Sequence, residues 1–255
     1  MHIGVANDPT RPLIDEIRWI AANGFGFVDL HIAPPNAALE STSWKDVRAQ
    51  LEGAGIAAIC RAPAYLPIDN PSPLVRQAAL DELRRCIDAT GVLGAPLLTT
   101  LFRGWPSHLP EESGYDYLRQ YLSILIEHGE PQGVAVALEN AADNRRQLKH
   151  FREIFRRLPN LKLAYDIGNG NVSTAKSMTR DYLFAFADRL RHVRISDNDG
   201  TRPAYLPFGA PESGGLDIAR ELRSLSGFGY DDSITLEIRG DRRWLLACRA
   251  ILRDL

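Results

Sequence analysis

Three short apolar runs of this sequence each end in a carboxylate. "VAVALE" ends at Glu139, "LKLAYD" at Asp166 and "ITLE" at Glu237. Each run has the length and composition of a buried strand, and the side chains of a strand alternate between its two faces. Glu139 then shares its face with the small residues Ala135 and Ala137. Small side chains suit the narrow interior of a closed sheet, so we expect the three acids to converge there.

Converging carboxylates repel one another and raise each other's pKa unless positive charge compensates them. Such acids can move protons as general acid and base. Their hard oxygen atoms can also hold a divalent cation such as Mg or Mn. The alternative is structural, with each acid pairing with a lysine or arginine at the rim of the sheet or capping the following helix.

A fourth run, "RHVRISDND", places polar side chains on one face of a strand. His192, Arg194 and Ser196 alternate with Val193 and Ile195. In an open sheet the polar face would meet water. In a barrel it would be the interior, and Arg194 would then lie near the mouth, between the acids of the preceding and following strands.

Strand-like and helix-like runs alternate along the whole chain. The helical runs include 12–24, 72–91, 115–129 and 145–158, where the apolar spacing is near 3.6 residues. Eight alternations in 255 residues predict a single (β/α)8 TIM barrel domain over 1–255. A doubly wound open sheet is the runner-up, but no Gly-x-Gly-x-x-Gly follows the first strand, so we expect no nucleotide cofactor. The expected strands are 2–7, 26–32, 56–61, 96–102, 134–139, 161–166, 192–196 and 233–238.

The connections that follow the strands are long, and those that precede them are short. In a barrel the long connections all emerge at the face where active sites lie. Trp105, in the connection after the fourth strand, could stack on a sugar or pack its own loop. His31 and Arg61 end two strands, and Arg239 follows the last one. With Arg194 they are candidate contacts for a substrate, or partners in salt bridges with the acids.

The overall composition argues against two classes of protein, those that bind nucleic acid and those that span a membrane. The formal net charge is −2 and the sequence pI is about 6.3, which argues against a nucleic-acid partner. No run approaches the ~18 apolar residues of a membrane helix, and the N-terminus does not read as a signal peptide. Three widely spaced cysteines indicate reduced thiols and a cytoplasmic protein: Cys60, Cys86 and Cys248.

Four motifs together resemble the xylose-isomerase-like TIM barrels. They are "ALEN", "AYDIGN", "RHVRISDN" and "PFGAPESGGLDIARELRSLSGFGYDDSITLEI". That superfamily includes sugar phosphate isomerases and epimerases, ketose 3-epimerases, hydroxypyruvate isomerase, inosose dehydratase and endonuclease IV. The resemblance implies that Glu139 and Glu237 serve as acid and base through an enediolate. It also implies that Glu139, Asp166 and Glu237 hold a divalent metal, and that Asn169 lines the substrate pocket.

The sequence departs from the family pattern at one position. The family carries His-x-His on the seventh strand and binds metal with the second histidine, where this chain has Arg194. An arginine cannot ligate, because its guanidinium is never deprotonated. Either the three carboxylates still hold Mn, Mg or Co with water completing the shell, or Arg194 replaces the metal and offers its donor fork to a substrate.

The favoured function is therefore an isomerase or epimerase of a small sugar, sugar acid or hydroxy-keto acid. One alternative is a lyase that dehydrates a keto-polyol by the same proton abstraction. Another, from a different class, is a catalytically lapsed barrel that binds a sugar-like ligand. We expect a small-molecule carbohydrate or keto acid as partner, with neither membrane nor nucleic acid, in a monomer or a homo-oligomer.

Overall fold

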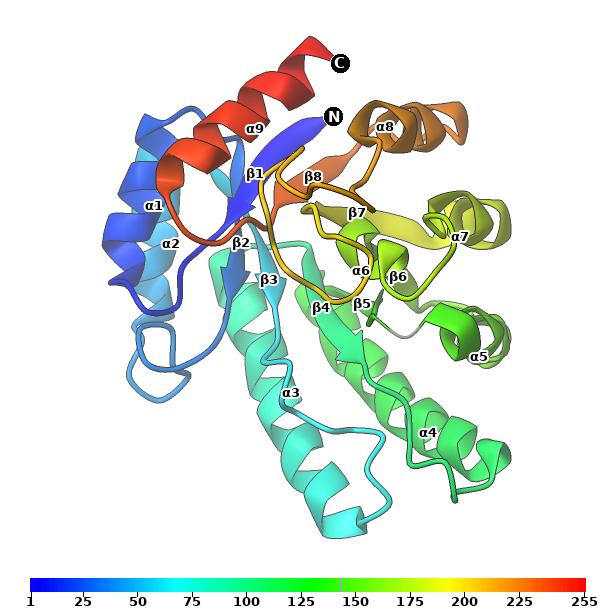
Figure 1. The fold of residues 1–255 in the computed structure, drawn as a ribbon. Helices are drawn as coiled ribbons and strands as arrows, with labels where there is room; N and C mark the ends of the chain where they lie inside the picture. The colour runs from blue at the N-terminus through cyan, green and yellow to red at the C-terminus, as the bar shows by residue number, and fades with distance from the viewer. Residues whose placement is uncertain (143) are drawn as a thin grey trace. The chain divides into compact units, whose positions relative to one another are not determined.

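Eight parallel strands form a closed barrel in the order β1-β2-β3-β4-β5-β6-β7-β8, with helices between them (Figure 1). This computed structural model describes residues 1–142 and 144–255. The prediction of a (β/α)8 TIM barrel is confirmed, and each expected strand is present within two residues of its expected start. The strands are β1 His2–Ala6, β2 Phe27–His31, β3 Ala57–Arg61, β4 Leu97–Phe102, β5 Ala135–Asn140, β6 Lys162–Asp166, β7 Leu190–Ile195 and β8 Ser233–Leu236.

The helices follow the predicted amphipathic runs. Their ends have local causes: Asp217 and Asp241 accept hydrogen bonds from backbone amides at the starts of α8 and α9, and Gly55 and Gly94 end α2 and α3 in the left-handed conformation. The helices are α1 Leu13–Ala22, α2 Trp44–Ala54, α3 Pro73–Leu93, α4 Glu111–Gly129, α5 Asn144–Arg157, α6 Ile167–Asn171, α7 Thr179–Phe186, α8 Ile218–Gly227 and α9 Arg242–Asp254. None of the helices in the described ranges is long and apolar enough to cross a bilayer.

Contacts divide the chain into two compact units. The first unit is Met1–Ala6, Glu139–Lys149 and Leu163–Leu255, and the second is Asn7–Leu138 and His150–Lys162. In the first, α9 packs on β1 and β8, and α7 packs against α8; in the second, α3 packs against α4 and α2. The expectation of one domain over 1–255 stays a prediction.

The short helix α6, directly after β6, leaves no room for side chains at two glycines. A Cβ on Gly168 would lie 2.8 Å from Ser196 Oγ, and one on Gly170 would overlap the Tyr165 hydroxyl. Tyr165 is fully buried, so its ring cannot swing away. Glycine is therefore required here by close packing.

We predict that Gly170→Ala lowers the free energy of unfolding by about 1–3 kcal/mol, because the added methyl overpacks the Tyr165 hydroxyl. Gly53→Ala is the control. Gly53 lies inside α2 with nothing within 4 Å of a Cβ, so alanine there should stabilise by roughly 0.5–1 kcal/mol. Urea unfolding measures both changes. Equal effects of the two substitutions would contradict the packing argument.

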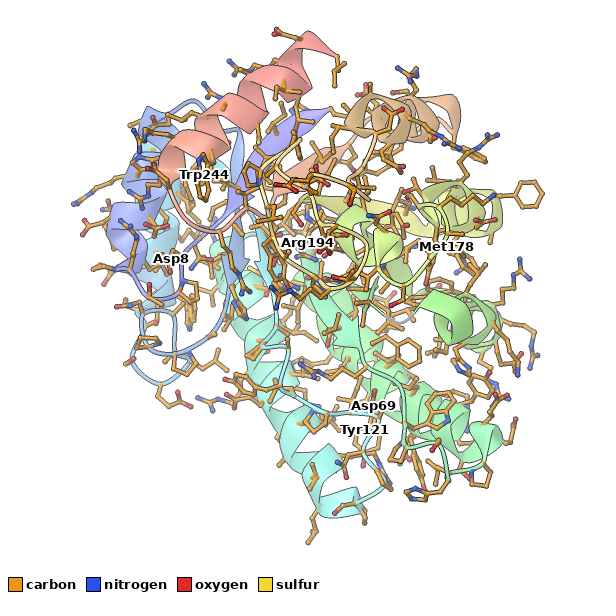
Figure 2. The ribbon with its side chains drawn as sticks, viewed as in Figure 1. Asp8, Asp69, Tyr121, Met178, Arg194 and Trp244 are labelled. Carbon is orange, nitrogen blue, oxygen red and sulfur yellow. The ribbon has the colours of Figure 1, made fainter. Side chains whose placement is uncertain are left out.

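Asp69 is a buried carboxylate in the connection between β3 and α3 (Figure 2). Burial raises its pKa to about 6, although backbone N–H groups of Arg103 and Gly104 donate to it and Arg103 adds an opposing charge. Asp69 thus ties the connection after β3 to the connection after β4, within the second unit, at an electrostatic cost in its ionised form.

Because the pKa of Asp69 is higher in the folded than in the unfolded chain, the folded state keeps a proton that the unfolded state has lost between about pH 4 and pH 6. The free energy of unfolding should therefore fall across that window as pH rises, by about 2–3 kcal/mol. Asp69→Asn should remove this decrease. Urea denaturation of both proteins from pH 4 to pH 7 measures it, and parallel pH profiles would refute it.

Candidate active site

The C-terminal ends of β5, β6, β7 and β8 bring four charged side chains of the first unit together. Glu139 is the last residue but one of β5, Asp166 ends β6, Arg194 lies on β7, and Glu237 follows β8 directly. Pairing of the strands aligns Arg194 with Asp166 on one side and with Thr235 on the other. The predicted parity is therefore consistent with the geometry on these strands.

Arg194 is the largest of the fully buried side chains and lies among the strands of this unit (Figure 2). Its Nη1 donates to Glu139 Oε2 at 2.6 Å, and its Nε lies 4.0 Å from Glu237 Oε2. The side chains of Glu139 and Arg194 are 0% and 1% exposed, whereas that of Glu237 is 11% exposed. The guanidinium thus forms a short buried ion pair with one glutamate and approaches the second, which is the more accessible of the two.

Asn140 links the ends of β5 and β6 through a fully buried carboxamide. Its Nδ2 donates to the Asp166 carbonyl at 3.0 Å, and its Oδ1 accepts the Asp166 N–H at 2.7 Å. Asn169 Nδ2 in turn donates to the Asn140 carbonyl, and Asp166 Oδ1 accepts the Asn169 N–H. Asp166 therefore caps α6, which was the structural alternative for a strand-end acid.

The buried carboxylate of Asp197 holds the connection from β7 to α8 in place. Asp197 Oδ1 accepts the N–H groups of Asn198 and Leu216, and Asp197 Oδ2 accepts that of Gly209, all at 2.9 Å. Its backbone pairs with Leu206 in an antiparallel bridge. This one side chain fixes three separate points of the connection, which lies yellow to orange in Figure 1. These hydrogen bonds give the connection a defined conformation.

Asn140 and Asp197 were not among the residues predicted from the sequence. Asn140 directly follows Glu139, and Asp197 follows Ser196 in "RISDN". The available signal was a polar residue next to a strand-end acid for Asn140, and a polar residue shortly after the seventh strand for Asp197. It could not reveal which backbone groups, distant in sequence, each side chain would bind.

The remaining predicted contacts have other neighbours. The exposed Arg239 lies with its guanidinium carbon 4.0 Å from the centre of the Tyr205 ring. In the second unit, His31 pairs in register with Arg61, and both are half-buried. Trp105 packs against the rings of Tyr115 and His150, with ring centres 5.1 and 4.8 Å apart. Their contact with a substrate stays a prediction.

The four charged side chains do not fit a metal held by Glu139 and Glu237 as they are arranged. Within the described ranges, no group of three or more His, Cys, Asp or Glu side chains is placed to hold a metal ion. The guanidinium already binds Glu139 Oε2 and faces Glu237 Oε2. Two unit charges about 4 Å apart repel by ~4 kcal/mol at an effective dielectric constant of about 20, and a divalent ion would be repelled about twice as strongly. The Glu139 oxygen that would ligate therefore faces a permanent cation.

Comparison with known proteins gives a family and a fold. A family model described as a xylose isomerase-like TIM barrel matches residues 17–254. No curated protein sequence matches the chain. Among solved structures, a D-tagatose 3-epimerase-like protein has a TM-score of 0.84 at 20% identity, covering 100% of this chain and 96% of its own. A 3-keto-D-glucoside 4-epimerase from E. coli has a TM-score of 0.78 at 18% identity, covering 100% of both chains. A D-psicose 3-epimerase, crystallised in the presence of D-fructose, has a TM-score of 0.81 at 12% identity, with 100% and 99% covered.

We predict that the Arg194–Glu139 pair is strongly coupled in stability. Arg194→Met alone should lower the free energy of unfolding by about 3–5 kcal/mol, because it leaves a buried carboxylate without its cation. Adding Glu139→Leu should recover much of that loss. A double-mutant cycle in urea measures the coupling energy, expected at ~2 kcal/mol or more.

The exposed pair Arg48–Glu52 on α2, with 2.7 Å between Nε and Oε1, is the matched control. Its coupling should be only about 0.3–0.5 kcal/mol, since water screens it. Similar coupling energies for the two pairs would mean that burial of the Arg194–Glu139 pair has no energetic consequence.

Proposed function

We propose, from the premise that this chain belongs to the xylose isomerase-like TIM barrel family, that it is an isomerase or epimerase of a small carbohydrate or hydroxy-keto acid. The observation that carries the proposal is the convergence of two buried glutamates on one buried guanidinium at the strand ends. The epimerase names of the structural neighbours support the same class of reaction.

The reaction requires a proton to leave the carbon beside a carbonyl and to return to the same or the adjacent carbon. A glutamate carboxylate takes the proton, and the electron pair of the C–H bond moves toward the carbonyl oxygen, giving an enediolate. Glu237 is suited to this step because it is the more accessible of the two glutamates. Guanidinium N–H groups of Arg194 can stabilise the negative charge on the enediolate oxygen.

The scaffold around these groups keeps them in place. Asn140 fixes the ends of β5 and β6, and Asp197 fixes the long connection after β7. A few tenths of an ångström matter for proton transfer, because donor and acceptor must approach within ≈ 2.6–3.2 Å. Buried, fully bonded amide and carboxylate groups supply that rigidity.

We predict that Glu237→Gln lowers the rate of solvent-deuterium incorporation into the substrate by about 10²–10⁴-fold while the fold is retained. Glu139→Gln should lower the exchange rate by a similar factor, since it also removes the ionic partner of Arg194. A panel of ketoses, sugar acids and hydroxy-keto acids in D₂O, followed by NMR, measures the exchange. Circular dichroism checks the fold.

Glu221→Gln is the control for loss of a buried glutamate. Glu221 lies on α8, is 5% exposed and accepts a hydrogen bond from Ser177. It belongs to no part of the proposed site, so exchange should be unchanged. Near-normal exchange in Glu237→Gln would eliminate the carboxylate mechanism. Release of water from the substrate would instead identify the dehydratase, and absence of exchange across the panel would favour the lapsed sugar-binding barrel.

A further inference from the structure

The position of Arg194 is defined by three strands at once. Register pairing places it beside Asp166 of β6 and beside Thr235 of β8. Its side chain then reaches Glu139 of β5 with Nη1 and lies 4.0 Å from Glu237 with Nε. The guanidinium therefore lies between two of the three acids that the family resemblance assigns to a metal ion, Glu139 and Glu237, and the third, Asp166, pairs with Arg194 in register on the neighbouring strand.

Burial holds the guanidinium of Arg194 in this position. Arg194 is 1% exposed, and its contact with Glu139 is a short charge-assisted hydrogen bond of 2.6 Å. A guanidinium does not lose its proton in proteins, so it cannot become a ligand to an added cation. Any cation that took up Glu139 and Glu237 together would first have to displace it.

We infer that Arg194 takes the place of the divalent cation in this site, so that the chain carries out its proton transfer with no bound metal. This inference rests on the proposed function for its chemistry but not for its test. The guanidinium supplies a fixed positive charge and several N–H donors where an enediolate oxygen would develop negative charge. The proton moves to a glutamate, the C–H electron pair forms a C=C bond, and the carbonyl π pair moves to that oxygen. Return of the proton to carbon reverses these shifts, so no redox partner is needed.

Binding of Mn²⁺ provides a test that does not depend on turnover. The parent chain, dialysed against EDTA and then against chelator-free buffer, should bind no Mn²⁺ at the stoichiometry of one ion per chain in calorimetry. Arg194→His removes the charge and places an imidazole where relatives carry their ligand. This variant should bind one Mn²⁺ per chain at least about 10–100-fold more tightly than the parent.

Two controls separate a specific effect from a general one. Arg194→Lys keeps a positive charge at the same position and should bind Mn²⁺ no better than the parent. Arg191→His makes the same substitution on the same strand at an exposed position, where Arg191 donates to the carbonyls of Asp188 and Leu190. It should also leave Mn²⁺ binding unchanged. If Arg194→His does not fold, the calorimetry of the parent still decides the question.

Stoichiometric Mn²⁺ binding by the parent would overturn the inference, whether or not Arg194→His binds Mn²⁺ more tightly. Deuterium exchange then separates it from the proposed function. Exchange by the metal-free parent supports both. Exchange that begins only after Mn²⁺ is added overturns the inference and leaves the proposed function standing. No exchange with or without Mn²⁺ overturns the proposed function and with it the catalytic role inferred for Arg194.

Discussion

The buried ion pair between Arg194 and Glu139 is the interaction on which the candidate site depends. Its two side chains are almost completely withdrawn from water and meet at 2.6 Å. Desolvation of two charges is expensive, and only good geometry with further hydrogen bonding offsets it. The strands beside the pair provide that geometry, because the register of β6, β7 and β8 determines where the guanidinium can reach.

Around this pair, buried polar side chains of the first unit bind backbone groups and one another. Asn140 closes the gap between β5 and β6 with a donor and an acceptor, and Asp197 receives three N–H groups from the connection after β7. His192, deeper on the same strand, has a serine and a threonine hydroxyl at its two ring nitrogens. Buried polar groups of this kind are costly when unpaired. Their pairing therefore confers a single arrangement on the strand ends.

The fold could be predicted from the sequence because it depends on periodicity. Eight apolar runs with helical runs between them leave few architectures, and the alternation of side chains on each strand predicts that Glu139, Asp166 and Arg194 share the interior face. The partners of these side chains could not be predicted, since they depend on the register between strands. A salt bridge between Arg194 and the acids was one of the predicted alternatives, but its partner Glu139 was not predicted, nor were the Tyr205 ring beside Arg239 and the Tyr115 and His150 rings beside Trp105.

A positive charge carried by a side chain is part of the polypeptide and does not have to be bound from solution. An ion held by ligands must be taken from the cell's supply and can be exchanged for another ion, whereas the guanidinium of Arg194 is synthesised with the chain and is present once in every molecule. On the barrel described here, this fixed charge lies at one position of β7, so the exchange of that single residue would remove it.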